Sequence, residues 1–454
     1  MGCFLYSTAS GRKREAPVSV FLPGCGNQNG ISSDAQSPSQ ESELTIYLLK
    51  ENFSDIADAV AQFRTENPEI ALSITQFDTT EELDDTLIRD FNTNTGPDVV
   101  LFDYTTTLDL QKMAKSNSFL TFDSTLQEKV GFDSNDYIPA ALEGCQIDGN
   151  LYFITISFLP QIEFYSTHMQ AQYQFQSNKT TRDEYYQILS SHAEQYREDP
   201  YVISIFEQYP LQGKTDISST QAVLASAGIL QNFSLLEGDA LRKTIDWIKL
   251  IQAQNAKFER YEGDFWDHFD TFRWNDNLFY TVSGYDLVTS VHSFLSTLDG
   301  IYEDNGNYVI FPMQDDPQSY SVLGTFFGAV GKDCDCPETA FSFLTLVADS
   351  YYMIKVTQNN PMWFAPVRTD LFEKALDVCT TNQLRVSGML VDPLSETEAE
   401  RLRDFYDSIA KYVLPNASLV NFIESEFAGY FQDTENYESA AVNFSRKYAL
   451  YLNE

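Results

Sequence analysis

The chain has 454 residues, with 29 Lys and Arg against 66 Asp and Glu, so its formal net charge at pH 7 is −37. This balance argues against nucleic acid as a partner, because the phosphate backbone is held by clustered Lys and Arg, and it disfavours polyanionic ligands. Hydrophobic residues make up 43% of the chain, and its length suggests two or three folded units, since single cores stop growing at about 250–300 residues.

A short apolar segment lies near the N-terminus. The basic residues 12–14 precede the apolar residues 16–22, which lead into Leu22-Pro23-Gly24-Cys25. This pattern resembles a bacterial lipobox, the signal after which a prolipoprotein is cut so that its cysteine becomes the lipidated first residue. We therefore expect residues 1–25 to be a signal peptide with lipobox, and Cys25 to carry a lipid anchor. The alternative is a leader with an incidental cysteine.

Residues 26–43 are rich in Asn, Gln, Gly, Ser and Pro and contain almost nothing apolar. Such a segment cannot bury enough surface to order itself, so we expect a disordered tether. Beyond it, no stretch of the chain approaches the ~18 consecutive apolar residues that a membrane-spanning helix needs. The expected arrangement is a folded body held near a membrane by its N-terminus.

The remaining cysteines give no clear framework. A disulfide between Cys145 and Cys379 is possible, although the sequence does not choose among the pairings. Cys334-Asp335-Cys336 is too short to be a zinc knuckle, and no second pair follows it. We expect this segment to be a surface turn, and we expect no metal site and no cofactor.

The fold is expected to begin at Leu44. Residues 44–49 are rich in strand formers, and a helix follows with Ser54 as its expected N-cap and apolar residues at helical spacing. Pro68 ends this helix, alternating apolar residues over 70–74 predict a second strand, and a second helix leads to a third strand that ends at Phe102. Strands alternating with helices predict a parallel sheet covered by helices.

Ligands of such sheets bind beyond the carboxyl ends of the strands. Phe102, Asp103 and Tyr104 stand at the end of the third predicted strand, and Lys50 and Glu51 stand at the end of the first. We therefore expect all five residues to face a ligand cleft.

Several segments in this order resemble one family. The segments are residues 44–49, Asn67-Pro68-Glu69-Ile70, Gly96-Pro97-Asp98-Val99, residues 148–152, residues 162–165, residues 180–184, Ser283-Gly284-Tyr285, residues 309–312, residues 327–330 and residues 364–368. They resemble the extracellular solute-binding proteins of ABC importers, family 1, the group of maltose- and oligosaccharide-receptor-like lipoproteins. The resemblance covers about residues 44–454. One departure concerns Phe153-Ile154-Thr155, where the family often has Pro, so the shape of the cleft wall there is open.

The resemblance implies an α/β, two-lobed periplasmic-binding-protein-like (type II) fold, with two hinged α/β domains and a central ligand cleft. The first lobe would comprise residues 44–160 and 315–355. The second would comprise residues 161–314 and 356–454.

A sugar ring offers apolar C–H faces and a rim of hydroxyls, so its site needs aromatic planes together with carboxylates or amides. The resemblance places Tyr285 and Trp363 where the family stacks its ligand. The expected ligand-binding residues are therefore Phe102, Asp103, Tyr104, Tyr285, Trp363, Lys50 and Glu51.

The resemblance implies a lipid-anchored substrate-binding component of an ABC transporter, located on the extracellular face of the cell membrane. It would capture a sugar or oligosaccharide by hinge closure and deliver it to permease subunits, so it would not be an enzyme. Two alternatives stay open. The solute could be a non-sugar polar molecule such as a peptide or an amine, or the chain could be a secreted glycan-active enzyme or adhesin.

Overall fold

The structure is a computed structural model. It describes residues 42–159, 162–165, 236–258, 280–282, 307–310, 320–350, 365–386, 389–391 and 393–451, together with isolated positions between 184 and 230. The predicted signal peptide, nearly all of the predicted tether, and Cys25 lie outside the described residues. Among the described helices, none is both long and apolar enough to cross a membrane.

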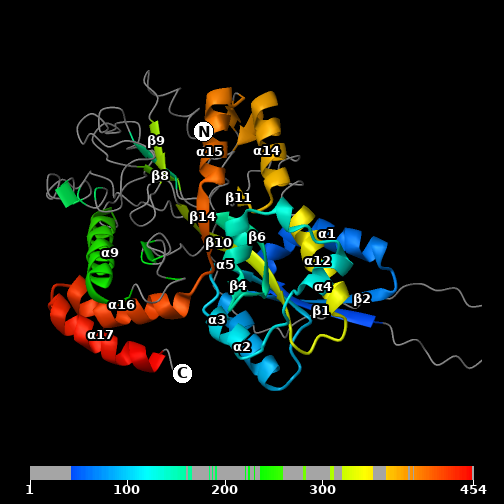
Figure 1. Ribbon diagram of the computed structural model, residues 1–454, viewed down its shortest axis with the longest axis horizontal. Helices are drawn as coiled ribbons and strands as arrows, with labels where there is room; N and C mark the ends of the chain where they lie inside the picture. Colours follow the sequence, from blue (N-terminus) through cyan, green and yellow to red (C-terminus); the bar gives the residue numbers. More distant parts are fainter. Residues whose placement is uncertain are drawn as a thin grey trace, which may run out of the picture. The chain divides into compact units, whose positions relative to one another are not determined.

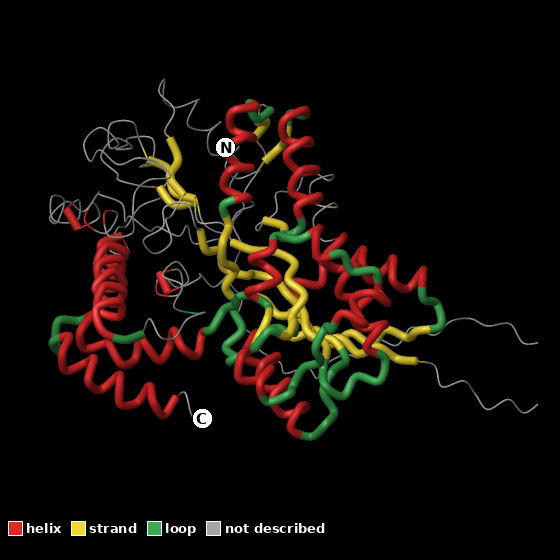
Figure 2. Tube along the Cα trace, viewed as in Figure 1, coloured by secondary structure: helices red, strands yellow, loops and turns green. Residues whose placement is uncertain are grey.

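The largest element is a seven-stranded mixed sheet (Figures 1 and 2). Its strands are β1 (Ser42–Leu49), β2 (Ile70–Phe77), β3 (Val99–Asp103), β6 (Phe153–Leu159), β10 (Tyr320–Val330), β11 (Ala365–Pro366) and β14 (Ile409–Val413). The order is β11-β6-β10-β3-β1-β2, and β14 also pairs with β10. The strands β1, β2 and β3 are parallel to one another, as the sequence predicts.

Helices cover both faces of this sheet (Figure 2). They are α1 (Phe53–Glu66), α2 (Thr80–Asn92), α3 (Leu110–Lys115), α4 (Ser124–Val130), α5 (Pro139–Gly144) and α12 (Pro337–Ser350), with the 3-10 turns η1 (Lys50–Asn52) and η2 (Ser134–Asp136). The predicted face of α1 is confirmed, because Ile56, Val60 and Phe63 are all buried. The predicted N-cap at Ser54 is wrong, since η1 leads directly into α1 and Asn52 is the N-cap residue.

Aromatic rings fill the core between the sheet and its helices. Phe63 of α1 meets Phe343 of α12 edge to face at 5.4 Å between ring centroids, and Phe122 stacks on Phe341 at 4.3 Å. A short hairpin is formed by β4 (Gln146–Ile147) and β5 (Asn150–Leu151). Its turn has Asp148 and Gly149 at positive φ, as a two-residue Asp-Gly turn requires.

A second sheet contains three strands in the order β8-β7-β9, all antiparallel. Its strands are β7 (Ile162–Tyr165), β8 (Tyr280–Val282) and β9 (Asn307–Ile310). Strand β7 begins three residues after β6 ends, and the chain returns from β9 to β10. The two sheets are therefore joined by chain segments that run in both directions.

Three further helices pack together near the C-terminus. They are α9 (Gly238–Phe258), α16 (Ala417–Phe431) and α17 (Tyr437–Tyr451). Lys249 of α9 donates to the Tyr430 carbonyl at 2.7 Å, and its ammonium lies 4.0 Å from the centre of the Tyr430 ring. Phe427 and Phe444 join α16 to α17 at 5.3 Å between ring centroids. These contacts join the three helices into one packed group.

The helices α14 (Thr369–Thr381) and α15 (Glu396–Asp407), in the part of the chain expected to form the second lobe (residues 356–454), share a core with the large sheet. Their buried residues belong to the same core cluster as the seven-stranded sheet. Phe372 of α14 stacks on Tyr406 of α15 at 3.9 Å, and the Tyr406 hydroxyl donates to the Pro366 carbonyl at 3.2 Å. The cause is strand β11, which precedes α14 and pairs with β6 of the sheet. A short hairpin, β12 (Leu384–Val386) and β13 (Met389–Val391), follows α14.

The possible disulfide between Cys145 and Cys379 does not form, since neither cysteine is part of a disulfide. Each is fully buried in the core cluster of the large sheet. Burial raises the pKa of the Cys145 thiol, because an apolar environment disfavours the thiolate. Both residues act as small apolar side chains in the core.

The side chain of Tyr412 crosses β10 from β14 to β6. Its hydroxyl donates to the Ser157 carbonyl at 3.2 Å and accepts a hydrogen bond from Thr155, and all three residues are fully buried. It passes over Gly324 so closely that a Cβ on that glycine would lie 2.3 Å from the hydroxyl oxygen. A glycine is required there because any side chain would occupy the space of the Tyr412 ring.

We predict that Gly324→Ala lowers the free energy of unfolding by about 1–3 kcal/mol, because the new methyl group overpacks the crossing. Urea unfolding of the purified protein measures the change. In a Tyr412→Ala background the same substitution should cost much less, since the clashing ring is absent. Equal costs in both backgrounds would contradict this account.

Candidate functional site

The carboxyl ends of β1, β2 and β3 meet at one edge of the large sheet, because the three strands are parallel neighbours. Asp103, the last residue of β3, and the residues that follow the three strands, 50–52, 78–80 and 104–107, form what we call the strand-end edge. Strand β6 is also antiparallel to β10, so its carboxyl end lies at this edge too. The edge carries three of the predicted polar ligand-binding residues: Lys50, Glu51 and Asp103.

Asp103 orders the loop that leaves β3. One carboxylate oxygen accepts from the Asn52 amide at 3.3 Å, and the other accepts from the Thr105 backbone N–H at 2.8 Å and from the Thr105 hydroxyl. The residue is only 6% exposed. Asp103 therefore fixes the backbone of the strand-end edge, rather than standing in solvent as a loop carboxylate.

The same loop depends on Asp84, which the sequence analysis missed. Asp84 projects from α2, is 2% exposed, and accepts from the Thr107 N–H at 2.7 Å and from the hydroxyls of Thr107 and Thr106 at 2.8 and 3.1 Å. Burial raises the pKa of this carboxyl, against the lowering effect of its hydrogen bonds. The three consecutive threonines after a buried strand were the available signal, because such hydroxyls need buried acceptors.

Phe102 does not face a cleft, and this expectation is corrected. Its side chain is fully buried, stacks on Phe327 at 5.6 Å between ring centroids and meets Phe119 edge to face at 6.0 Å. All five residues of β3 are buried, because helices cover both faces of the sheet at this strand. Phe102 therefore has no surface to offer a solute.

Tyr104 follows β3 directly and is 8% exposed. Its backbone N–H donates to the Thr325 carbonyl of β10 at 3.0 Å, which continues the pairing of the two strands beyond Asp103. The segment Phe153-Ile154-Thr155, where the resemblance left the cleft wall open, begins β6 and is buried in the sheet. It lies at the opposite end of that strand from the strand-end edge.

Lys50 and Glu51 are exposed at the end of β1. The Lys50 ammonium lies 2.9 Å from the Asp78 carboxylate, which stands at the end of β2. Such an exposed ion pair contributes little to stability, so a solute could displace it at small cost. The predicted aromatic residues Tyr285 and Trp363 lie outside the described residues.

Arg368 fixes the segment that leaves β11. Its guanidinium pairs with Asp136 at 3.2 Å, with Asp370 at 2.9 Å and with Asp349, and it lies 5.7 Å from the centre of the Tyr137 ring. The pKa of Asp370 is lowered by its hydrogen bonds to Arg368 and Lys374, which outweigh the raising effect of burial. This network anchors the Pro366-Val367-Arg368 segment that the sequence analysis singled out.

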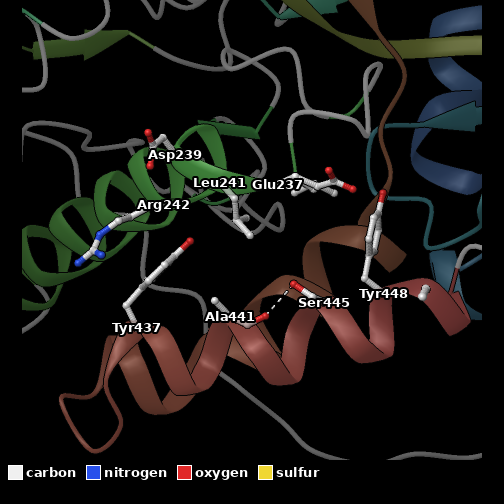
Figure 3. A pocket seen from close by; sticks show the side chains of 11 residues that line it. Glu237, Asp239, Leu241, Arg242, Tyr437, Ala441, Ser445 and Tyr448 are labelled. Atoms are coloured by element: carbon white, nitrogen blue, oxygen red, sulfur yellow. Dashed lines mark hydrogen bonds between the residues drawn. The ribbon is translucent and has the colours of Figure 1, made fainter.

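A separate pocket of about 630 Å³ lies between α9 and α17 (Figure 3). Tyr437 and Tyr448 line it from α17, and Leu241 and Arg242 line it from α9. The Arg242 guanidinium lies 4.8 Å from the centre of the Tyr437 ring and pairs with Glu438 at 3.1 Å. The volume falls in the range of small-molecule sites, about 300–1,000 Å³. No residue of this pocket was predicted from the sequence.

The chain has the two-lobed, periplasmic-binding-protein-like α/β fold expected from the sequence. Solved structures of sugar-binding proteins have similar folds. The sugar-binding protein MalE from Xanthomonas citri has a TM-score of 0.60 at 13% identity, with 89% of this chain and 96% of that chain covered. An ABC substrate-binding protein from Listeria monocytogenes, solved in complex with cycloalternan, has a TM-score of 0.55 at 13% identity, with 91% and 100% covered.

A periplasmic oligogalacturonide binding protein from Yersinia enterocolitica gives a similar result, with a TM-score of 0.56, 12% identity, and coverage of 90% of this chain and 99% of that chain. No protein-family model matches the chain, and no curated protein matches its sequence. At these identities the likeness establishes the fold.

Asp84 allows a test of the loop at the strand-end edge. Because its pKa is raised in the folded state, ionisation of the carboxyl costs folding free energy, and this cost appears as the pH rises through the carboxyl range. We therefore predict that the wild type loses stability relative to Asp84→Asn as the pH rises above the ordinary pKa of an aspartate carboxyl. Urea unfolding at several pH values measures this difference. The control is Asp85→Asn, which changes an exposed neighbour. A difference that does not vary with pH would contradict the prediction.

Proposed function

We propose that this protein is the substrate-binding component of an ABC importer and that it binds a sugar or oligosaccharide at the strand-end edge. The observation that carries the proposal is the fold, which aligns over 89–91% of this chain with sugar- and oligosaccharide-binding proteins. The polar strand-end edge supports it, because ligands of open α/β sheets bind beyond the carboxyl ends of the strands.

The connections between the two sheets suit a hinge. Only residues 160–161 separate β6 from β7, and residues 311–319 separate β9 from β10. A solute that contacts both lobes would favour the closed form by its differential affinity for that form, and closure would report occupancy to a permease. No bond is made or broken in this mechanism, so we propose a binding protein and not an enzyme.

We propose Lys50, Glu51, Asp103 and Tyr104 as the contribution of the first lobe, and Tyr285 and Trp363 as aromatic planes for the sugar. Trp363 stands two residues before Ala365, which pairs with Phe158 near the carboxyl end of β6. That spacing supports its assignment to the strand-end edge. Asp103 would hold the loop in position and would also accept hydrogen bonds from hydroxyl groups of the sugar.

The negative charge of the chain favours neutral or cationic solutes over anionic ones. A neutral oligosaccharide satisfies this requirement. An amine or a cationic peptide would also satisfy it, and remains the second candidate on that observation.

We predict that a neutral oligosaccharide raises the melting temperature of the purified protein in a panel of sugars, amines and peptides. At a ligand concentration of about 100 times the dissociation constant, the stabilisation should reach about 2.7 kcal/mol. Trp363→Ala should weaken this binding by at least about 2- to 10-fold. A lost aromatic contact costs about 0.5–1.5 kcal/mol in addition to the free energy of the buried apolar area.

Tyr152→Ala is the matched control, because Tyr152 precedes β6 at the opposite edge of the sheet. A shift with amines or peptides and none with sugars would refute the carbohydrate assignment. Unchanged sugar affinity in Trp363→Ala would refute the role of that residue.

We also propose that Cys25 carries a lipid and that residues 26–41, which precede β1, tether the body to the extracellular face of the membrane, within reach of the permease. We predict that Cys25→Ser moves the protein from the membrane fraction to the medium when it is expressed in a lipoprotein-processing bacterium. The control is Cys3→Ser, which should stay in the membrane fraction. Equal membrane fractions for all three proteins would contradict the anchor.

A further inference from the structure

Three side chains that bind metals in other proteins meet beside the large sheet. Asp98 stands just before β3, and Cys334 and Cys336 lie in the turn between β10 and α12. Their ligand atoms all lie within 4.8 Å of one another. The sequence shows only the Cys334-Asp335-Cys336 half of this cluster, because Asp98 is more than 200 positions away in the chain.

Main-chain contacts bring the two halves of the cluster together. The Gly331 N–H, at the end of β10, donates to the Asp98 carbonyl at 2.9 Å, and the Cys334 N–H donates to the Gly331 carbonyl at 3.2 Å. A Cβ on Gly331 would lie 2.3 Å from the Pro97 carbonyl oxygen, so only glycine permits this approach. The cysteine turn is therefore held against Asp98 by the backbone.

Thr45 of β1 orients the Asp98 carboxylate. The Thr45 N–H and hydroxyl both donate to one oxygen of Asp98 at 2.8 Å, and the Asp98 N–H donates to the Thr45 hydroxyl oxygen at 2.9 Å. Metal-binding carboxylates in proteins are commonly held by hydrogen bonds of this kind, which fix the direction of the ligand.

Cys336 stands immediately before α12, and the N-terminus of a helix favours negative charge. Two thiolates and one carboxylate around a divalent cation carry a net charge of −1, which suits that position.

We propose that Asp98, Cys334 and Cys336 bind one zinc ion, with water as the fourth ligand. Thiolate ligands select zinc over calcium or magnesium, which prefer oxygen. Ligand atoms around tetrahedral zinc lie about 3.3–3.8 Å apart, given bonds of about 2.0–2.3 Å, so small side-chain rotations bring the cluster to that geometry. Binding releases the two thiol protons to the solvent.

The zinc site lies at the amino end of β3, at the opposite end of that strand from the strand-end edge. It would tie the start of β3 to the turn that follows β10, and would stabilise the sheet rather than contact the solute. The proposal is independent of the proposed function, since it requires no sugar and no permease.

The test uses the full-length chain with Cys3→Ser and Cys25→Ser, so that the thiols of the N-terminal segment cannot bind metal. After reduction and removal of metal, zinc chloride is titrated in a calorimeter, and cobalt chloride is used to read thiolate coordination by near-ultraviolet absorption. We expect one zinc per chain, a higher melting temperature with zinc, and the absorption band of cobalt-bound thiolate.

Asp98→Asn and Cys336→Ser should each weaken zinc binding by at least about 10–100-fold, the range seen when an outer-shell partner alone is lost. Asp335→Asn is the matched control, because this exposed carboxylate stands between the two cysteines and outside the cluster. Thr45→Val should give an intermediate loss. Melting curves recorded without metal show which variants are folded. If a cysteine variant does not fold, the comparison of Asp98→Asn with the parent protein decides the test.

Absence of zinc binding by the reduced protein would overturn the proposal, as would equal affinity in Asp98→Asn and the parent. A Cys334–Cys336 disulfide in protein purified without reductant, detected by its mass, would overturn it as well, since an oxidised pair has no thiolate to offer.

Discussion

Strand β10 hydrogen-bonds to three other strands, with β3 and β6 antiparallel to it and β14 parallel to it. Almost all of its eleven residues are buried, so few of its backbone groups can form hydrogen bonds with water instead. At its middle, Gly324 leaves room for Tyr412, whose hydroxyl reaches β6. This crossing joins strands from three distant parts of the chain, and the neighbouring strands and loops are positioned by it.

Two features of β10 bear on function. Its amino-terminal half lies beside the carboxyl ends of β3 and β6, where Thr325 continues the pairing to Tyr104 at the strand-end edge. Its carboxyl end, Val330, leads to Gly331 and the cysteine turn beside Asp98. One strand thus supports the proposed solute site at one end and the proposed zinc site at the other.

The proposed solute site at the strand-end edge is ordered by hydrogen bonds within the protein. Asp103 and Asp84 accept hydrogen bonds from the backbone and hydroxyls of residues 105–107, which hold the loop in one conformation. A preordered loop loses less conformational entropy on binding. The more exposed groups at this edge, Lys50 and Glu51, are those that a solute can reach without disturbing the core.

The local elements and the class of fold could be predicted from the amino-acid sequence. Apolar periodicity predicted β1, α1, β2, α2 and β3, because a strand or helix repeats its buried positions at a fixed interval. It could not place Phe102, since all of β3 is buried and no alternation marks an exposed face. It also could not join Asp98 to Cys334, or assign α14 and α15 to the large sheet. Those outcomes depend on pairings between distant strands, β10 with β3 and β11 with β6, which form only when the whole chain folds.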